Sequence, residues 1–396
     1  MENFLSLLQN ELRYYLKNKP ALAMLFIVPV LLTFFFGGLY SHHKVTEVKI
    51  AVVDEDNTSL SRMLSENLDR SEKFQVTEHL TDSEKIGTYL NDNRVDAVIL
   101  IPNHFMKDIK RYIPVEVGVF LDGSNMLIGN TVLSGANEVI QTTQAGLLIK
   151  ILEGMGNSQV KSINIAQLIQ FRSRIWYNPT FSYTYFMVLG LVGTVIQQVT
   201  LFQSAQSFIR DNVNGVDILW QKAGMSFGAY YLAKAAFYWL SAVFNSMLCL
   251  LVAKGFFGIP IKGDPVTLLT LIAVFSAAIT ALGFLFSVIA RTEMLANQYA
   301  MIVASPAFLI SGFTWPFFAM PLFFQWLGKA IPLTHFLLAL RAVTLRGTGI
   351  EVIMPYIYAL LAMTVLFATI ALVILSQRWS MGEKLAQPAL EVEGEV

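Results

Sequence analysis

The chain of 396 residues contains one cysteine, Cys249, and only 14% of its residues are charged. One cysteine cannot close an intramolecular disulfide or supply a thiolate metal site. Basic and acidic residues both number 28, so no net charge attracts the molecule to nucleic acid. The 55% of apolar residues excludes a disordered chain and departs from soluble enzymes, where roughly 45–50% are apolar and about 25% charged. This composition is typical of a membrane protein.

The few charges are unevenly distributed along the chain. Residues 41–178 hold 31 of the 56 charged side chains, a density close to that of soluble domains. The remaining residues are correspondingly poor in charge. This contrast predicts a soluble domain inserted into a membrane protein.

Long apolar runs divide the charge-poor part of the chain. A helix needs about 20 mostly apolar residues to cross a hydrocarbon core roughly 30 Å thick. Six runs satisfy this requirement, and Lys234 is the one charge inside them. The predicted transmembrane helices cover residues 20–40, 183–209, 232–252, 266–290, 298–318 and 354–376.

Lysine and arginine near the helix ends predict the orientation, because cytoplasmic loops are enriched in both. Successive transmembrane helices cross in opposite directions, so every second connecting segment lies on the same side of the membrane. One side therefore holds Arg13, Lys17, Lys19, Arg210, Lys222, Arg378 and Lys384. Lys329, Arg341 and Arg346 lie on the other side, where part of the chain re-enters the membrane. We therefore expect both termini in the cytoplasm and residues 41–178 outside.

The leader, residues 1–19, has apolar side chains at helical spacing and predicts an amphipathic helix along the cytoplasmic membrane surface. A solvated extension and a cleaved signal peptide are weaker interpretations, because the run that follows is long enough to span the membrane. The expected organisation is the leader at 1–19, a first transmembrane helix at 20–40, an outer domain at 41–178, the other five helices at 179–378, and a cytoplasmic tail at 379–396.

The outer domain alternates short β-branched runs with polar helical stretches, which predicts an α/β fold with a largely parallel sheet. The predicted strands are 48–53, 74–78, 95–101 and 115–121, and the predicted helices are 59–68, 82–91, 103–112 and about 125–152. His42 and His43 have no third ligand at a suitable spacing. The acidic run 54–57 is read as a helix cap. No metal site is expected.

The segment 209–224, between the second and third transmembrane helices, combines charge with apolar side chains. It predicts a short helix against the membrane that could transmit force from a soluble partner, although an ordinary amphipathic loop is the alternative. The residues that carry this prediction are Arg210, Asp211, Gly215, Trp220 and Lys222.

A second segment, residues 311–350, has prolines in apolar sequence, which break a continuous helix. Broken helices at membrane depth are tolerated only where protein or water satisfies the freed backbone groups. We therefore expect re-entrant helices at 314–340, on the outer side, between the fifth and sixth transmembrane helices.

In these two segments the chain resembles the permease subunits of ABC exporters, of the type-2 class with a large extracytoplasmic domain after the first transmembrane helix. Arg210, Gly215 and Lys234 resemble the coupling segment of that family, which often has Thr and Pro where this chain has Val216 and Gly224. The matching positions of the second segment are Ser311, Gly312, Pro316, Met320, Pro321, Pro332, Thr334, Arg341 and Gly347.

The resemblance implies half of a transporter in a bacterial cytoplasmic membrane. A second copy or a paralogue would complete the pathway, and two cytoplasmic ABC ATPase subunits would dock on residues 209–224 and the leader. The chain lacks the phosphate-binding motif G-x-x-x-x-G-K-S/T, so ATP and Mg are expected on the partner and no cofactor in this chain. Membrane lipids and a periplasmic adaptor are further candidate partners, and nucleic acid is not.

Polar side chains inside the predicted transmembrane helices are candidates for the pathway, because such groups normally face the bundle interior or a wet cavity. Hydrogen bonding that only holds the helices together is an equal alternative. The candidate pathway residues are Gln197, Gln198, Gln203, Asn245 and Ser305.

No Asp or Glu lies deep in a predicted transmembrane helix, which disfavours an ion exporter or an ion-coupled transporter. The phenylalanine content favours an apolar or amphipathic cargo, such as a drug, lipid or peptide-like molecule. The competing function is a membrane-anchored protein that binds or assembles envelope components without transport.

Overall fold

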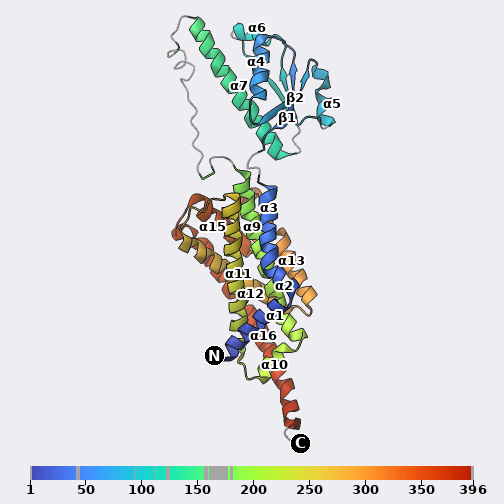
Figure 1. The fold of residues 1–396 in the computed structure, drawn as a ribbon, viewed down its shortest axis with the longest axis vertical. Coiled ribbons are helices and arrows are strands. Elements are labelled where there is room, and N and C mark those ends of the chain that lie inside the picture. The colour runs from blue at the N-terminus through green and yellow to red at the C-terminus, as the bar shows by residue number, and fades with distance from the viewer. Residues whose placement is uncertain are drawn as a thin grey trace. The chain divides into compact units, whose positions relative to one another are not determined.

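The computed structural model describes residues 2–41, 45–92, 94–111, 113–121, 125–155, 159, 177–178 and 182–393 (Figure 1). The chain divides into two compact units. The helical unit comprises Met1–His43 and Ile175–Val396, and the sheet unit comprises Lys44–Arg174. The sheet unit therefore falls within the charge-rich part of the sequence.

The helical unit starts with α1 (Glu2–Lys17), which matches the predicted amphipathic leader. Polar Asn18 separates α1 from the next helix, and its side chain accepts a hydrogen bond from the backbone N–H of Ala21. The other elements are α2 (Lys19–Leu22), the π-helix η1 (Ala23–Ile27), α3 (Val28–Leu39), α9 (Tyr183–Val213), α10 (Val216–Lys222), α11 (Phe227–Phe257), α12 (Pro265–Ile289), α13 (Glu293–Ile310), the 3-10 helix η3 (Phe317–Ala319), α14 (Leu322–Lys329), α15 (Pro332–Arg341), the π-helix η4 (Ala342–Arg346) and α16 (Ile350–Glu393).

Five helical stretches of the described chain are long and apolar enough to cross a membrane. They are Lys19–Leu39, Tyr183–Val213, Phe227–Phe257, Pro265–Ile289 and Ile350–Ser380. The sixth predicted helix, 298–318, differs: α13 starts earlier, ends at Ile310 and is only 18 residues long. It stops there because the chain turns at Gly312, whose φ of +73° lies in the left-handed region that favours glycine.

The helices α9 and α12 pack against each other and form much of the interior of the helical unit. Their close approach depends on small residues. A β-carbon added at Gly283 in α12 would lie 1.9 Å from Oγ of Ser204 in α9. The hydroxyl of Ser287 accepts hydrogen bonds from the backbone N–H groups of Phe208 and Ile209 at 2.9 and 3.0 Å. These contacts fix the register of the two helices.

Between α13 and α16, the predicted break into short helices is present as η3, α14 and α15. Pro321 immediately precedes α14, and Pro332 is the first residue of α15. Proline is tolerated at the start of a helix, because the first backbone N–H groups have no helical acceptor. The prolines therefore begin helices here rather than kinking one long helix.

In the described part of the sheet unit, strands and helices alternate as the sequence predicts. The strands occur in the order β2-β1-β3-β4; β1 is parallel to β2 and β3, and β4 is antiparallel to β3, so the sheet is mixed. The elements are β1 (Val48–Asp54), α4 (Ser59–Asp69), β2 (Phe74–Leu80), the 3-10 helix η2 (Ser83–Lys85), α5 (Ile86–Asn91), β3 (Ala97–Ile101), α6 (Phe105–Lys110), β4 (Gly118–Leu121) and α7 (Met126–Gly154).

Alternate residues of β1 face two different cores, as the two-residue period of a strand requires. Ile50 and Val52 pack with α4 and α7, whereas Ala51 and Val53 pack toward α5. The N-cap of α4 is Thr58 rather than an acidic residue of 54–57, because the Thr58 hydroxyl accepts from the backbone N–H of Ser61 at 3.3 Å. Asp54 supports this cap, since its carboxylate accepts a hydrogen bond from the Ser61 hydroxyl at 2.7 Å. His42 and His43 lie outside the described residues, within which no group of three His, Cys, Asp or Glu could hold a metal ion.

Candidate functional site

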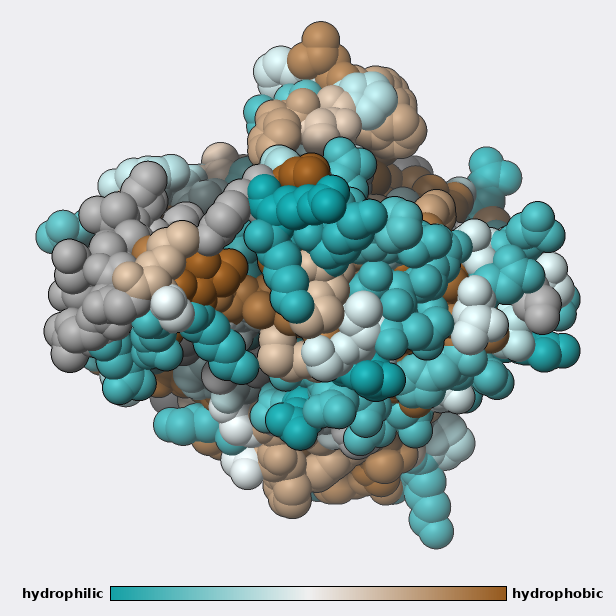
Figure 2. All heavy atoms as spheres, turned by 90° about the horizontal axis from the view of Figure 1, so that it is seen from above, coloured by the Kyte–Doolittle hydropathy of each residue, from teal (hydrophilic) through white to brown (hydrophobic). Residues whose placement is uncertain are grey.

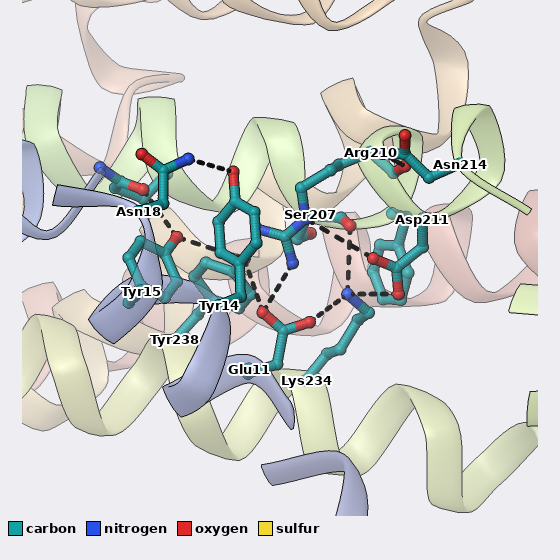
Figure 3. A network of polar contacts seen from close by, with 12 residues as sticks. Glu11, Tyr14, Tyr15, Asn18, Ser207, Arg210, Asp211, Asn214, Lys234 and Tyr238 are labelled. Carbon is teal, nitrogen blue, oxygen red and sulfur yellow. Dashed lines mark hydrogen bonds and ion pairs between the residues drawn. The ribbon is translucent and has the colours of Figure 1, made fainter. Parts of the chain in front are cut away.

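Four charged side chains from three helices meet inside the helical unit (Figure 3). Glu11 comes from α1, Arg210 and Asp211 from the last turn of α9, and Lys234 from α11. At most 7% of the surface of each residue is exposed. We call these residues the charge cluster. Its two cations and two carboxylates balance, which a buried set of charges requires.

The ion pairs of the charge cluster bridge helices that are far apart in the sequence. Glu11 receives Nη2 of Arg210 at 2.7 Å on one carboxylate oxygen and Nζ of Lys234 at 2.5 Å on the other. Lys234 Nζ lies 2.8 Å from Asp211 and also donates to the backbone oxygen of Ser207 at 3.1 Å. An ammonium group has three N–H donors, so these three acceptors use the whole capacity of Lys234.

Aromatic residues enclose the charge cluster. The guanidinium carbon of Arg210 lies 3.8 Å from the ring centroid of Tyr14, which is a cation–π contact. The Tyr230 hydroxyl donates to Asp211 at 2.9 Å, and the Tyr238 hydroxyl donates to Glu11 at 3.4 Å. The rings exclude water while the hydroxyls satisfy the carboxylates. The arrangement is thus a fixed joint between α1, α9 and α11.

The pKa of Glu11 reflects two opposing effects. Burial raises the pKa of this carboxyl, but the positive charges of Lys234 and Arg210 outweigh burial and leave the pKa below its ordinary value. Burial also raises the pKa of the Tyr15 hydroxyl, which therefore stays protonated and donates to Oε1 of Gln203 at 2.7 Å. Both groups keep their bonding roles across the neutral range.

The helix α10 follows directly from the charge cluster. Gly215 has a φ of +68°, a left-handed conformation that glycine adopts without strain, and this turn starts α10. No residue of α10 is buried, and Leu219 is 64% exposed. On the other face, Trp220 is half-buried near the C-terminal helix, and Gln221 donates to the backbone oxygen of Trp379 at 3.3 Å. The helix therefore presents an exposed surface while its other face is anchored.

The structure separates the five predicted coupling residues into two groups. Arg210 and Asp211 are buried in the charge cluster. Gly215 and Trp220 are half-buried and Lys222 is exposed, along the turn and helix that the charge cluster supports. A partner could touch the second group directly, whereas it would reach the first only through α10. The coupling role of all five stays a prediction.

The predicted pathway residues also have different environments. Gln203 accepts from the Tyr15 hydroxyl, and Nδ2 of Asn245 donates to the backbone oxygen of Leu25 at 2.7 Å. Oδ1 of Asn245 has no partner among the described residues. Gln198 is half-buried and Ser305 is exposed on α13. Gln197 is fully buried, and neither its amide nitrogen nor its amide oxygen has a hydrogen-bond partner among the described residues. It is the strongest candidate of the five for contact with water or cargo.

Several positions of the segment 311–350 have structural roles at its turns. The Ser311 hydroxyl accepts from the backbone N–H of Phe313 at 3.2 Å, and Nη2 of Arg341 donates to the backbone oxygen of Phe313 at 2.6 Å. The Thr334 hydroxyl donates to the backbone oxygen of Gly328 at 2.7 Å. These bonds tie α13, α14 and α15 together.

The remaining positions of that segment also lie where the chain changes direction. Gly347 ends η4 with a φ of +71°, and Gly312 is left-handed at the end of α13. Pro316 precedes η3, and the backbone oxygen of Met320 accepts from the Gln325 side chain at 2.9 Å, just before Pro321. These residues therefore stabilise the turns of the segment and do not form a catalytic site.

Sequence reasoning missed Glu11, the acceptor at the centre of the charge cluster. The available signal was its place between Leu7 and Tyr15, four residues from each, on the apolar face of the leader. An acidic residue on an apolar face indicates a buried partner cation. The cation, however, comes from α9 or α11, about 200 residues away.

Comparison with known proteins now places this architecture. Residues 19–373 match the family described as ABC-2 family transporter protein. The chain belongs to the ABC-2 transporter family. The match covers nearly the whole chain and confirms the resemblance found in the sequence.

Several curated relatives of this ABC-2 family member are bacterial permeases. The chain is 25% identical to the inner membrane transport permease YhhJ of Escherichia coli, over 94% of this chain and 96% of that protein. It is 22% identical to the probable multidrug ABC transporter permease YbhR of Escherichia coli, over 91% and 94%. It is 22% identical to the linearmycin resistance permease protein LnrN of Bacillus subtilis, over 91% and 96%. These similarities support a transport permease role in a bacterial membrane.

Proposed function

We propose that the chain is the transmembrane permease subunit of an ATP-driven exporter in a bacterial cytoplasmic membrane. The observation that carries the proposal is α10, a short helix with exposed Leu219 and Lys222 on a rigid buried joint. A docked ATPase that moves α10 would move α1, α9 and α11 together, because Glu11, Arg210 and Lys234 tie these helices to one another. ATP and Mg would bind to that separate subunit.

The proposed orientation places both termini and α10 in the cytoplasm and residues 41–178 outside. It follows from the lysine and arginine bias of the short loops. Two permease chains, identical or paralogous, would form the pathway, as the family implies. A periplasmic adaptor could then bind outside, and lipids would cover the apolar helices.

We propose an apolar or amphipathic cargo for this transporter. The names of YbhR and LnrN connect those relatives with multiple drugs and with linearmycin. In the described transmembrane helices, both amide atoms of Gln197 are buried and unpaired, and so are the side-chain oxygens of Asn245, Ser276 and Thr280. The buried carboxylate of Asp211 is instead paired with Lys234. Such an interior suits a mainly apolar molecule better than a bare ion.

The test uses the full-length chain purified from its native membrane together with any bound ATPase. We expect an ABC ATPase in stoichiometric amount, whose cargo-stimulated ATP hydrolysis falls at least about tenfold in Leu219→Arg and in Lys222→Glu, because both changes alter the exposed face of α10. Lys254→Glu, at an exposed lysine near the end of α11, is the matched control. It should change neither the amount of bound ATPase nor the cargo-stimulated ATP hydrolysis.

Two outcomes would overturn the proposal. Recovery of envelope proteins without an ATPase would favour the anchoring function. Unchanged stimulation in both α10 variants, with the ATPase still bound, would show that coupling does not use α10.

A further inference from the structure

Two adjoining hollows lie beside the second half of α7 in the sheet unit. Their volumes are about 460 and 550 Å³, and they share Ile109, Leu147 and Ile151 as lining residues. Small-molecule sites have volumes of roughly 300–1,000 Å³. We call the two hollows together the α7 groove. It is formed by α4, α6, α7 and the segment before β4.

The groove exists because the apolar face of α7 continues beyond the core of its own unit. Val132, Ala136 and Val139 of α7 are buried in that core. Two turns later, Leu147 is half-buried and Leu148 is 38% exposed, so apolar side chains remain in partial contact with water. Apolar surface in contact with water is unfavourable, and a groove of this kind is typical of a binding site.

The polar groups of the two hollows are unequally distributed. In the first hollow, Thr143 and Gln144 are the two polar lining residues, and the Thr143 hydroxyl already accepts from the Asn67 side chain at 3.1 Å. The second hollow adds two basic residues, Lys110 from the end of α6 and Lys150 from α7. One end of the groove is therefore apolar and the other is cationic.

The two lysines at the groove are available to a ligand. Both are exposed, and neither forms an ion pair within the described part of the chain. Glu153 is three residues from Lys150 but neither lines the groove nor pairs with that lysine. The mouth of the groove thus has two unneutralised positive charges, which attract an anion.

Hydrophilic side chains cover much of the face seen in Figure 2, and apolar side chains gather there in only a few places. A lipid-facing surface would instead be broadly apolar.

We propose that the α7 groove binds a single-chain amphiphile with an anionic head group. The hydrocarbon tail of the amphiphile lies among Phe105, Ile109, Leu147 and Ile151. Its head group pairs with Lys110 and Lys150. The segment 160–176 of this chain is a poor alternative occupant, since it contains three basic residues and no acidic one. Charge complementarity thus favours an anionic ligand over the chain's own sequence.

The test uses the full-length chain in neutral maltoside micelles and a 12-carbon carboxylate with a diazirine near its apolar end. After photolysis, mass spectrometry should locate saturable labelling on Phe105–Lys110 and on residues 147–151. Unlabelled dodecanoate should compete, and dodecanol should compete roughly threefold to tenfold more weakly, as expected for the loss of two partly exposed ion pairs.

Variants separate the two parts of the site. Leu147→Arg should abolish labelling of the groove. If that variant does not fold, Leu147→Trp replaces it, because tryptophan fills the space without adding a charge and should also abolish labelling. The double variant Lys110→Glu/Lys150→Glu should weaken the carboxylate roughly threefold to tenfold and leave dodecanol competition unchanged. The matched control is Lys49→Glu/Lys107→Glu, which changes two exposed lysines outside the groove and should bind normally.

Three results would overturn the proposal. Unsaturable or dispersed labelling would mean that the groove is no binding site. Equal competition by dodecanol and dodecanoate would show a site that does not select an anion. Labelling that appears only after deletion of residues 160–171 would show that the chain itself occupies the groove. None of these readouts depends on transport or on the ATPase.

Discussion

The helix α9 carries polar side chains at two levels, and their surroundings differ. At its end, Arg210 and Asp211 are buried, and their ionic groups pair with Glu11 and Lys234. Three to four turns earlier, Gln197 is equally buried but its amide has no hydrogen-bond partner among the described residues. Both levels lie on one continuous helix. The comparison therefore distinguishes polar groups that stabilise the structure from a polar group that is available to water or cargo.

The physical basis of the difference is the cost of burial. An unpaired buried charge is far more unfavourable than an unpaired amide, so charges at the end of α9 must be paired for the chain to fold. An unpaired amide costs only about 1–3 kcal/mol and can be retained where a function needs it. We use four experiments to test this distinction, in order of decreasing effect.

The largest effect is expected for Lys234→Met. The change removes the cation that lies 2.8 Å from Asp211 and leaves Arg210 as the one cation of the charge cluster for two buried carboxylates. We expect it to lower the free energy of unfolding by about 3–5 kcal/mol. Thermal unfolding in detergent, followed by tryptophan fluorescence, measures this loss. Lys222→Met, at an exposed position, is the control and should unfold like the natural chain. An unaltered transition in Lys234→Met would show that the charge cluster contributes no stability.

A double-mutant cycle then tests whether Glu11 and Lys234 act as a pair. In Lys234→Met, Glu11 and Asp211 share Arg210 as their remaining cation, so the charge cluster has one negative charge in excess. Glu11→Gln removes that excess, so the double variant should be more stable than the sum of the single losses predicts. The expected coupling is about 0.5–3 kcal/mol, measured as the difference between the double variant and the two single variants. Strict additivity would argue against direct pairing.

Gln197→Leu should act in the opposite direction on stability. Replacing an unpaired buried amide by an apolar group of similar size leaves the free energy of unfolding unchanged or raises it by up to about 1–3 kcal/mol. Transport measured in proteoliposomes with the ATPase should nevertheless fall. Gln377→Leu, at an exposed glutamine of α16 that is not a pathway candidate, is the control. A clear loss of stability in Gln197→Leu would mean that the amide holds the helices together.

The smallest effect concerns pH. Because the folded protein lowers the pKa of Glu11, this carboxylate contributes stability above its unfolded pKa of about 4.3, and the contribution is lost as pH falls through the lower folded pKa. The difference in unfolding temperature between the natural chain and Glu11→Gln should therefore be constant from about pH 7.5 to 5.5. A difference that shrinks within this window would indicate a raised pKa for Glu11.

Local sequence patterns predicted most of the elements. The strand at 48–53 and the helix at 59–68 appear within one residue of their expected ends, because β-branched runs, caps and turns act over a few residues. The prolines correctly indicated short helices between α13 and α16. The span at 298–318 was less accurate, since hydrophobicity continues past Ile310 while the backbone turns at Gly312.

The candidate site was only partly predictable. The sequence singled out Arg210 and Asp211, but it predicted a short helix against the membrane rather than a buried joint. Gln197 and Gln203 looked equivalent in the sequence, and the structure distinguishes them because the Tyr15 hydroxyl reaches only Gln203. Pairing of this kind depends on how helices pack, which helical spacing does not specify.

The sequence alone determined the membrane class, the order of the elements and the two amphipathic segments, since composition and periodicity act locally along the chain. The tertiary structure alone decided which polar groups are satisfied. Glu11 meets Arg210 and Lys234 across 199 and 223 residues of sequence, and the α7 groove arises from four separate parts of the sheet unit. Burial converts these long-range contacts into energy, because a charge or an apolar surface is stabilised only by the groups that fold against it.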